Sequence, residues 1–130
     1  HIRPQKGAAH MELKHINKLE KTIAVEEIRV MVSPDWVDRW VELDDEVWTS
    51  RLKVSEGFLG KEIWISRDVP GEINVVIYWA DYDIWQAHDK SGWCIELDQQ
   101  MEQRMEGHLL SMEFKFKENQ KFKCYEMSNI

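Results

Sequence analysis

The sequence has few of the features that mark a disulfide scaffold, a zinc site or a membrane protein. Its only two cysteines, Cys94 and Cys124, have neither CxxC spacing nor metal-type neighbours. This pattern favours reduced thiols and leaves a Cys94–Cys124 disulfide as the alternative. No apolar run approaches the roughly 20 residues that a membrane span needs. The segment after Met11 is polar and charged, so we expect a cytoplasmic protein with no membrane contact.

Positive charge is also scarce, since 17 Lys and Arg residues face 24 Asp and Glu residues and the net charge is −7. Residues 1–10 have no periodicity and end at a cloning-type His10-Met11 junction. We therefore expect 1–10 to be an expression-tag remnant and 11–130 to form one domain. An acidic domain repels phosphate backbones, which argues against nucleic acid as a partner. The alternating lysines within 115–123 are interpreted as the solvent face of strands.

Hydrophobic periodicity predicts an alternation of strands and helices. Residues 25–32 alternate as a half-buried strand does, and Ser33-Pro34 then starts a helix that runs to about Val54. Strand patterns recur further along the chain, at 61–66, 73–79, 109–117 and, as a short last strand, 121–127. A second helical region follows the capping candidates Asp81 and Asp83 and is broken at Ser91-Gly92. Residues 12–22 fit a loop, a helical turn or an edge strand.

Glycines mark the points where these elements end. In "EGFLGKEIW" (56–64), Gly57 can end the long helix in a positive-φ conformation. Gly60 can mark a bulge in the following strand or a close backbone approach. Pro70-Gly71 predicts a tight reversal between two strands of a hairpin. Gly107 is a plausible end for the second helical region.

The order strand–helix–strand–strand–helix–strand predicts an α+β protein with a ferredoxin-like split β-α-β (β-α-β-β-α-β) antiparallel sheet and two helices on one face. One strand face is aliphatic and suits burial under helices. The opposite face is too apolar for open water and too polar for a simple core, which predicts a homodimer that buries it. The expected interface residues are Met31, Glu62, Trp64, Val76 and Tyr78.

This order, the glycine junction and "YWADYDIWQAH" (78–88) resemble the dimeric α+β barrel superfamily, which includes antibiotic biosynthesis monooxygenases and haem-degrading monooxygenases. The resemblance covers about 25–116. The wider pattern, "EVWTSRL…EGFLGKEIW…INVVIYWA", is most similar to an uncharacterised branch known mainly from cyanobacteria.

The resemblance implies oxygen chemistry without implying a cofactor. The haem-degrading members use an Asn in the first strand, a Trp in the second helix and a His ten residues later. Here 25–32 contains no Asn, His88 stands at the Trp position and Asp98 stands at the His position. Haem degradation therefore ranks third among the hypotheses, and we expect no haem, other cofactor or metal.

The first hypothesis is a small-molecule site that oxidises or isomerises a flat hydrophobic compound without a cofactor. His88 is the candidate catalytic residue, because its ordinary pKa suits proton transfer and it shares a helix face with Trp85. The predicted ligand-binding residues are Trp40, Trp79, Trp85 and Trp93. Acids at 44–46 could reach the same cavity, or form a solvated helix face. The second hypothesis is a non-catalytic protein-interaction module in which the tryptophans only pack, with His88 bonded to Asp83 or Asp89 near the surface.

Overall fold

The structure is a computed structural model that describes residues 17–18, 21–119 and 122–123. The chain divides into two compact units. One unit spans Ile23–Asn119 and the other combines His1–Thr22 with Gln120–Ile130. In the latter, β1 (Asn17–Lys18) pairs antiparallel with β6 (Phe122–Lys123). An edge strand was one of the three predictions for 12–22. A single domain over 11–130 stays a prediction.

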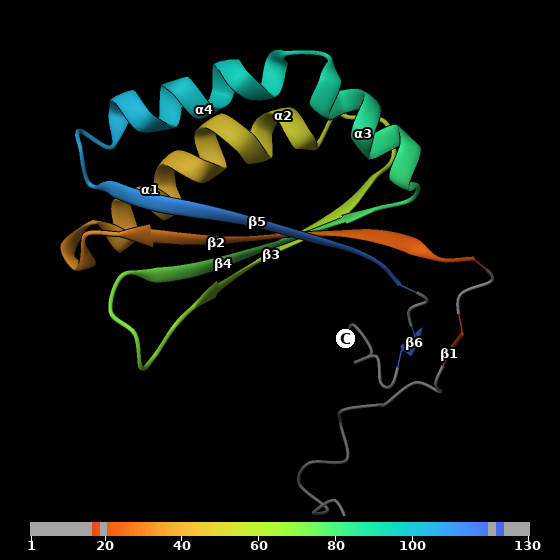
Figure 1. Ribbon diagram of the computed structural model, residues 1–130, viewed down its shortest axis with the longest axis horizontal. Coiled ribbons are helices and arrows are strands. Elements are labelled where there is room, and N and C mark those ends of the chain that lie inside the picture. Colours follow the sequence, from red (N-terminus) through yellow and green to blue (C-terminus); the bar gives the residue numbers. More distant parts are fainter. Residues whose placement is uncertain (1–16, 19–20, 120–121, 124–130) are drawn as a thin grey trace, which may run out of the picture. The chain divides into compact units, whose positions relative to one another are not determined.

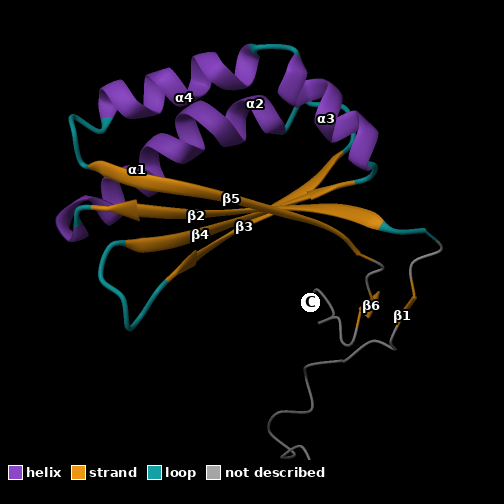
Figure 2. Ribbon diagram, in the orientation of Figure 1, coloured by secondary structure: helices purple, strands orange, loops and turns teal. Residues whose placement is uncertain are grey.

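The unit Ile23–Asn119 is built on a four-stranded antiparallel sheet in the order β3-β4-β2-β5. Its strands are β2 (Ile23–Val32), β3 (Phe58–Ile65), β4 (Glu72–Trp79) and β5 (Leu109–Asn119). All helices of this unit cover one face of the sheet (Figures 1 and 2). This is the arrangement that the β-α-β-β-α-β order predicts.

The first helical segment is continuous but changes its winding along its length. It begins as a 3₁₀ turn (η2, Pro34–Trp36), continues as α1 (Val37–Asp44) and a π-helical turn (η3, Asp45–Thr49), and ends as α2 (Ser50–Leu52). Leu43, Asp44 and Val47 are buried and follow the buried Trp40 at regular helical spacing. Of the two alternatives given for the acids at 44–46, a solvated helix face is wrong for Asp44.

The helix starts agree with the sequence in position and differ in detail. Asp81 caps α3 (Tyr82–Lys90) by accepting hydrogen bonds from the backbone N–H groups of Asp83 and Ile84. Ser33 precedes the first helical turn but makes no side-chain cap. Its hydroxyl is instead hydrogen-bonded to His108 Nδ1 at 2.9 Å.

Positive-φ glycines end or break the helices. Gly57 has φ +80°, and a Cβ there would lie 2.8 Å from Ile84 Cγ2. Gly92, at φ +93°, separates α3 from α4 (Trp93–Arg104), whereas the Ser91 hydroxyl bonds back to the His88 carbonyl and does not cap α4. The pairing register shifts between Phe58 and Gly60, which agrees with the bulge rather than with a close backbone approach at Gly60. Gly107, at φ +85°, follows α4 as predicted.

The helix-facing side of the sheet holds the core. Strand pairing places Ile28 opposite Val75, and Val30 opposite Ile73. These residues pack with the helices around a cluster that includes Leu43, Leu52 and Met105. The predicted aliphatic face is therefore the helix-covered face. Two charged residues, Glu26 and Lys61, pair with Ile77 in the register and share that face.

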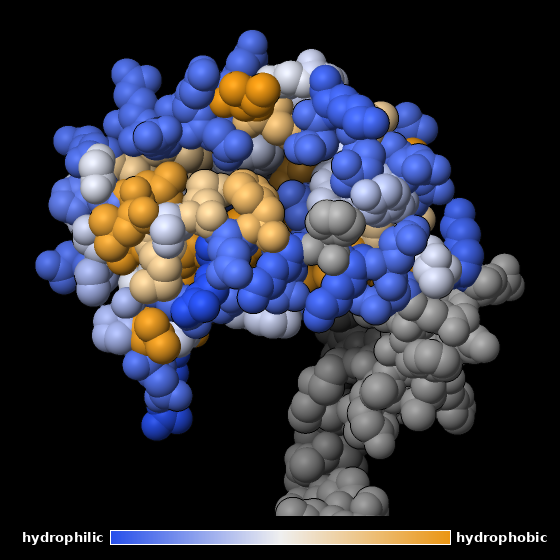
Figure 3. Space-filling view, viewed as in Figure 1, coloured by the Kyte–Doolittle hydropathy of each residue, from blue (hydrophilic) through white to orange (hydrophobic). Residues whose placement is uncertain are grey.

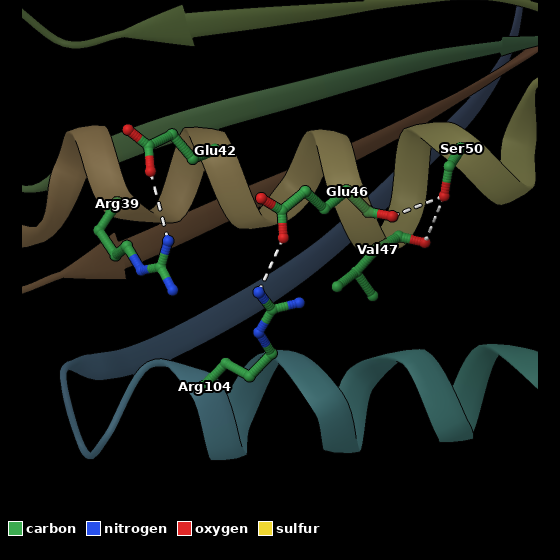
Figure 4. Close-up of polar contacts among 6 residues, drawn as sticks. All are labelled: Arg39, Glu42, Glu46, Val47, Ser50 and Arg104. Carbon is green, nitrogen blue, oxygen red and sulfur yellow. Dashed lines mark hydrogen bonds and ion pairs between the residues drawn. The ribbon is translucent and has the colours of Figure 1, made fainter.

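Ion pairs join the outer surfaces of the helices. Arg104 of α4 donates to Glu46 at 2.7 Å, and Arg39 of α1 donates to Glu42 at 3.3 Å (Figure 4). Both pairs are substantially exposed, so we expect each to contribute at most about 1 kcal/mol to stability. The charged side chains on this outer side thus form exposed ion pairs. The charged side chains between the helices and the sheet, by contrast, are buried.

Candidate active site

A cavity of about 70 Å³ lies between the helices and the sheet of the unit Ile23–Asn119. Among its lining residues, Asp89 and Phe114 are exposed, so the cavity reaches the surface beside these residues. This volume has room for several water molecules. The strand residues at its floor include Glu26, Ile28, Val75, Ile77, Trp79 and Met112, and the helices supply Trp40, Asp44, Trp48, Trp85, His88, Asp89, Trp93, Cys94 and Asp98.

All four predicted ligand-binding tryptophans line this one cavity. Trp40, Trp79 and Trp85 are buried, whereas Trp93 is half-buried. The sequence did not single out Trp48, which lines the same wall and lies 6.1 Å from Trp93 between ring centroids. The structure thus gathers these side chains, while their role in binding stays a prediction.

Glu26 places a carboxyl group on the floor of the cavity. Trp79 Nε1–H donates a hydrogen bond of 3.0 Å to Glu26 Oε1. Burial raises the pKa of Glu26 from 4.5 to about 7, and the charges of Asp89 and Asp98 add to the rise. The Trp79 hydrogen bond and the Lys61 ammonium oppose it. A carboxyl group with a pKa near 7 can accept or donate a proton at neutral pH.

Two further groups near Glu26 also have raised pKa values. Burial, followed by the charge of Asp89, raises the pKa of Asp98 to about 6. Burial likewise raises the pKa of the Cys94 thiol to about 12, so this free cysteine is a poor nucleophile. Cys124 lies outside the described residues, and the disulfide alternative stays untested.

Lys61 and Asp44 form a buried ion pair at another part of the wall. Lys61 Nζ donates to Asp44 Oδ2 at 2.5 Å and to Thr49 Oγ1 at 3.1 Å. Both charged side chains are about nine-tenths buried or more, with exposures of 7% and 6%. Burial raises the pKa of Asp44, and the Lys61 ammonium opposes this rise. Of the acids at 44–46, Asp44 is buried while Asp45 and Glu46 are exposed.

His88 lines the cavity, and a hydrogen bond to the backbone carbonyl of Glu56, just before Gly57, fixes its orientation. Its Nε2 lies 2.8 Å from the Glu56 carbonyl oxygen. Because a carbonyl oxygen only accepts, Nε2 carries the proton of this bond, and Nδ1 holds the lone pair of the neutral ring. The ring lies 5.3 Å from Trp79 and 5.7 Å from Trp93 between centroids. The predicted bond to Asp83 or Asp89 is replaced by this backbone contact.

The sequence contained a signal for Glu26 that the aliphatic pattern hid. Glu26 has the same parity in its strand as Ile28, Val30 and Val32, so it is a carboxyl group on the core face. Lys61 has the same relation to Ile63. A charged residue in the buried phase of a strand is uncommon unless it is paired or functional.

The residues of this site do not fit haem or a metal ion. The described histidine of the cavity already donates through Nε2, and a cavity of about 70 Å³ is far smaller than a macrocycle. Among the described residues, no three His, Cys, Asp or Glu side chains are grouped so that they could hold a metal ion.

The opposite face of the sheet carries the five residues predicted at a dimer interface. Trp64 is 53% exposed and Glu62 is exposed, whereas Met31 and Tyr78 are half-buried. Glu62 accepts hydrogen bonds from Trp64 Nε1 at 3.2 Å and from the Tyr78 hydroxyl at 3.4 Å. Val76 is already buried within the single chain.

No helix in the described part of the chain is long and apolar enough to cross a membrane.

No family model and no curated protein matches this chain, but solved structures do. SnoaB, a cofactor-independent oxygenase from Streptomyces nogalater, is similar with a TM-score of 0.59 at 12% identity, over 73% of this chain and 90% of that chain. A candidate antibiotic biosynthesis monooxygenase from Caulobacter crescentus CB15 reaches a TM-score of 0.60 at 11% identity, over 76% and 91%. One from Nitrosomonas europaea reaches 0.59 at 11% identity, over 78% and 93%. The chain therefore has the α+β fold of the antibiotic biosynthesis monooxygenase-like structures, the class known as dimeric α+β barrels.

Proposed function

We propose that the cavity binds a small, flat, hydrophobic compound and that Glu26 removes a proton from it. One observation carries the proposal: a carboxyl group with a pKa of about 7 faces an aromatic-lined cavity and is held by Trp79. A general base works best when its pKa lies near the working pH. His88 is the second polar group, and its Nδ1 would accept a hydrogen bond from a substrate hydroxyl.

Two reactions use the same proton transfer. In an isomerisation, Glu26 takes a proton from one carbon and returns it to another, and nothing is oxidised. In an oxygenation, the electron-rich anion reacts with dioxygen; a CH₂ group becomes C=O while one oxygen atom leaves as water. SnoaB is a cofactor-independent oxygenase of the same fold, which supports the second reaction as a class for this chain.

The test compares Glu26 with its neighbour Glu27, which lies on the opposite face of β2. Anthrone is a suitable probe, because it is planar and has an acidic CH₂ group, and oxygen uptake reports its oxidation. We expect the rate to rise with pH through about 7 and Glu26→Gln to lower it about 10²- to 10⁴-fold. Glu27→Gln should leave the rate unchanged. Equal rates for both variants and the unaltered protein would exclude Glu26 as the base.

The aromatic walls and His88 are tested separately. If they bind the substrate, Trp85→Ala and His88→Ala lower affinity or turnover in protein that remains folded by circular dichroism. The alternative is a non-catalytic interaction module. The burial of Trp40, Trp79 and Trp85 supports this module. The cavity volume of about 70 Å³ supports it too, because common ligand sites have volumes of about 300 Å³ or more. Unchanged affinity in both variants, measured with a compound that does bind, favours that module.

We also propose that two copies pair through the sheet face that bears Trp64 and Tyr78. A half-exposed tryptophan beside a half-buried tyrosine is the kind of surface that a second copy covers. Cytoplasmic location and membership of the cyanobacterial branch remain predictions of the sequence.

A further inference from the structure

Most charged side chains in the wall of the cavity are acidic. Its acidic side chains are Glu26, Asp44, Asp89 and Asp98, and the one Lys or Arg side chain among the described lining residues is Lys61. The acids come from four different elements, namely β2, the end of α1, α3 and α4. The cavity therefore presents a negative potential to anything that enters it.

Lys61 does not balance the acids near the opening. Its ammonium is committed to Asp44 and Thr49, and this pair is buried. By contrast, no hydrogen bond or ion pair joins the side chain of Asp89 or Asp98 to another described residue. Asp89 and Asp98 also act electrostatically on Glu26, which raises its pKa. Glu26, Asp89 and Asp98 thus line one cavity and interact electrostatically, and the Lys61 ammonium opposes them only in part.

Aromatic faces line the same cavity. Trp79 and Trp93 both lie within 6 Å of the His88 ring, and Trp85 and Trp48 line the cavity beside them. The Arg51 guanidinium already lies over the Trp93 ring, with Cζ 4.1 Å from the centroid. The electron-rich face of an indole attracts cations, and Trp is the strongest side chain in this respect.

We infer that the ligand of this cavity is a planar compound carrying a positively charged nitrogen, a protonated amine or a quaternary ammonium group, which lies against the tryptophans and faces Glu26, Asp89 and Asp98. The inference deepens the proposed function and rests on it. The cation would occupy the position between the carboxyl groups, while the flat apolar part fills the space over Ile28, Val75 and Ile77. An anionic compound of the same shape would meet like charge on three sides.

Three two-ring probes of nearly equal shape separate charge from shape. They are 1-methylquinolinium as the cation, 1-methylnaphthalene as the neutral compound and 1-naphthoate as the anion. Binding is followed by quenching of tryptophan fluorescence with the full chain at a pH of about 8, where Glu26 is ionised. We expect the cation to bind about tenfold or more tightly than the neutral probe and the anion to bind weakest.

Two Asp→Asn substitutions assign the preference to the cavity. Asp98→Asn removes a carboxylate that lines the cavity, whereas Asp68→Asn removes one from the exposed turn between β3 and β4. Asp98→Asn should lower the affinity for 1-methylquinolinium about fivefold and leave 1-methylnaphthalene unchanged. Asp68→Asn should change neither. If Asp98→Asn unfolds the chain, Asp89→Asn replaces it, because Asp89 is exposed and also lines the cavity.

The outcomes separate the inference from the proposed function. Equal or tighter binding of the neutral or anionic probe would overturn the cationic ligand and leave the cavity as a binding site. A cation preference that Asp68→Asn lowers as much as Asp98→Asn would also overturn it, because the attraction would then come from the net charge of the chain. Binding of none of the three probes would count against both.

Discussion

The two faces of the sheet hold similar residues and use them differently. On the helix-covered face, Glu26 and Lys61 lie among buried aliphatic and aromatic side chains, and burial raises the pKa of Glu26 to about 7. On the opposite face, Arg29 pairs with Glu72, and Glu62 bonds to Trp64 and Tyr78 at the surface. The contrast shows that enclosure, rather than residue type, makes a carboxyl group of this chain suited to proton transfer.

The largest expected effect comes from the buried charge on the helix-covered face. Lys61→Met would leave the Asp44 carboxylate buried without its partner, which we expect to destabilise the protein by about 3–5 kcal/mol in urea unfolding. Lys115→Met is the matched change on the opposite face, where the side chain is 51% exposed. It should cost less than about 1 kcal/mol. Equal losses in the two variants would contradict the contrast between the faces.

The second prediction is a pH dependence of stability that belongs to Glu26. Its folded-state pKa of about 7 lies above the ordinary 4.5, so the folded state binds more protons than the unfolded state between these values. The free energy of unfolding therefore falls as pH rises through this window, by about 3 kcal/mol for this group. Asp98, with its pKa of about 6, acts with the same sign.

Glu26→Gln sharpens this prediction, because an amide does not titrate. The quantity to compare is the free energy of unfolding of the variant minus that of the unaltered protein, measured with denaturant. This difference should be more favourable to the variant at a pH of about 8 than at about 4, by up to about 3 kcal/mol. Glu27→Gln, on the other face of the same strand, provides the control. A gain for Glu26→Gln that does not change with pH would show that the carboxyl group is not enclosed.

The third prediction concerns the uncovered face. Trp64 is 53% exposed in the single chain, and an aromatic residue at the centre of an interface commonly contributes at least about 2 kcal/mol to association. We expect sedimentation of the unaltered protein to show a dimer and Trp64→Ser to shift it toward monomer. Leu110→Ser, a similar exposed apolar residue on β5, should leave the dimer intact. A monomeric unaltered protein would refute the pairing.

The smallest expected effect is on the reactivity of the Cys94 thiol. Because burial raises the pKa of Cys94 to about 12, iodoacetamide at a pH of about 8 should alkylate it far more slowly than the same residue in unfolded protein. Peptide mass spectrometry distinguishes Cys94 from Cys124. Rapid modification of Cys94 in the folded state would show that the helix-covered space is open at this wall.

Most of the fold could be predicted from the sequence, because alternation and glycine positions report on local geometry. The phase of Ile28, Val30 and Val32 identified the face beneath the helices, and Gly57 marked the end of the first helical segment. Apolar surface also lies along the edge of the sheet formed by β5, where Leu110 and Phe114 are 60% and 62% exposed (Figure 3). The alternation on that strand does not distinguish a covered position from an edge position.

The candidate site was predicted only in part, for a physical reason. A tryptophan at helical spacing indicates burial, so the aromatic walls followed from the pattern. Glu26 was missed, and Asp44 was left between the cavity and a solvated helix face, because the burial of a charge depends on partners distant in the chain, namely Trp79 and Lys61.

The central claim is that Glu26 is an enclosed proton acceptor in a ligand-binding cavity. Carbon-13 NMR of the side-chain carboxyl groups, with Glu26 assigned by its loss in Glu26→Gln, measures the pKa directly with and without 1-methylquinolinium. We predict a midpoint of about 7 for the free protein and a lower one with the cation bound, because a positive charge favours the carboxylate. A midpoint near 4.5 that the probe does not move would contradict the account.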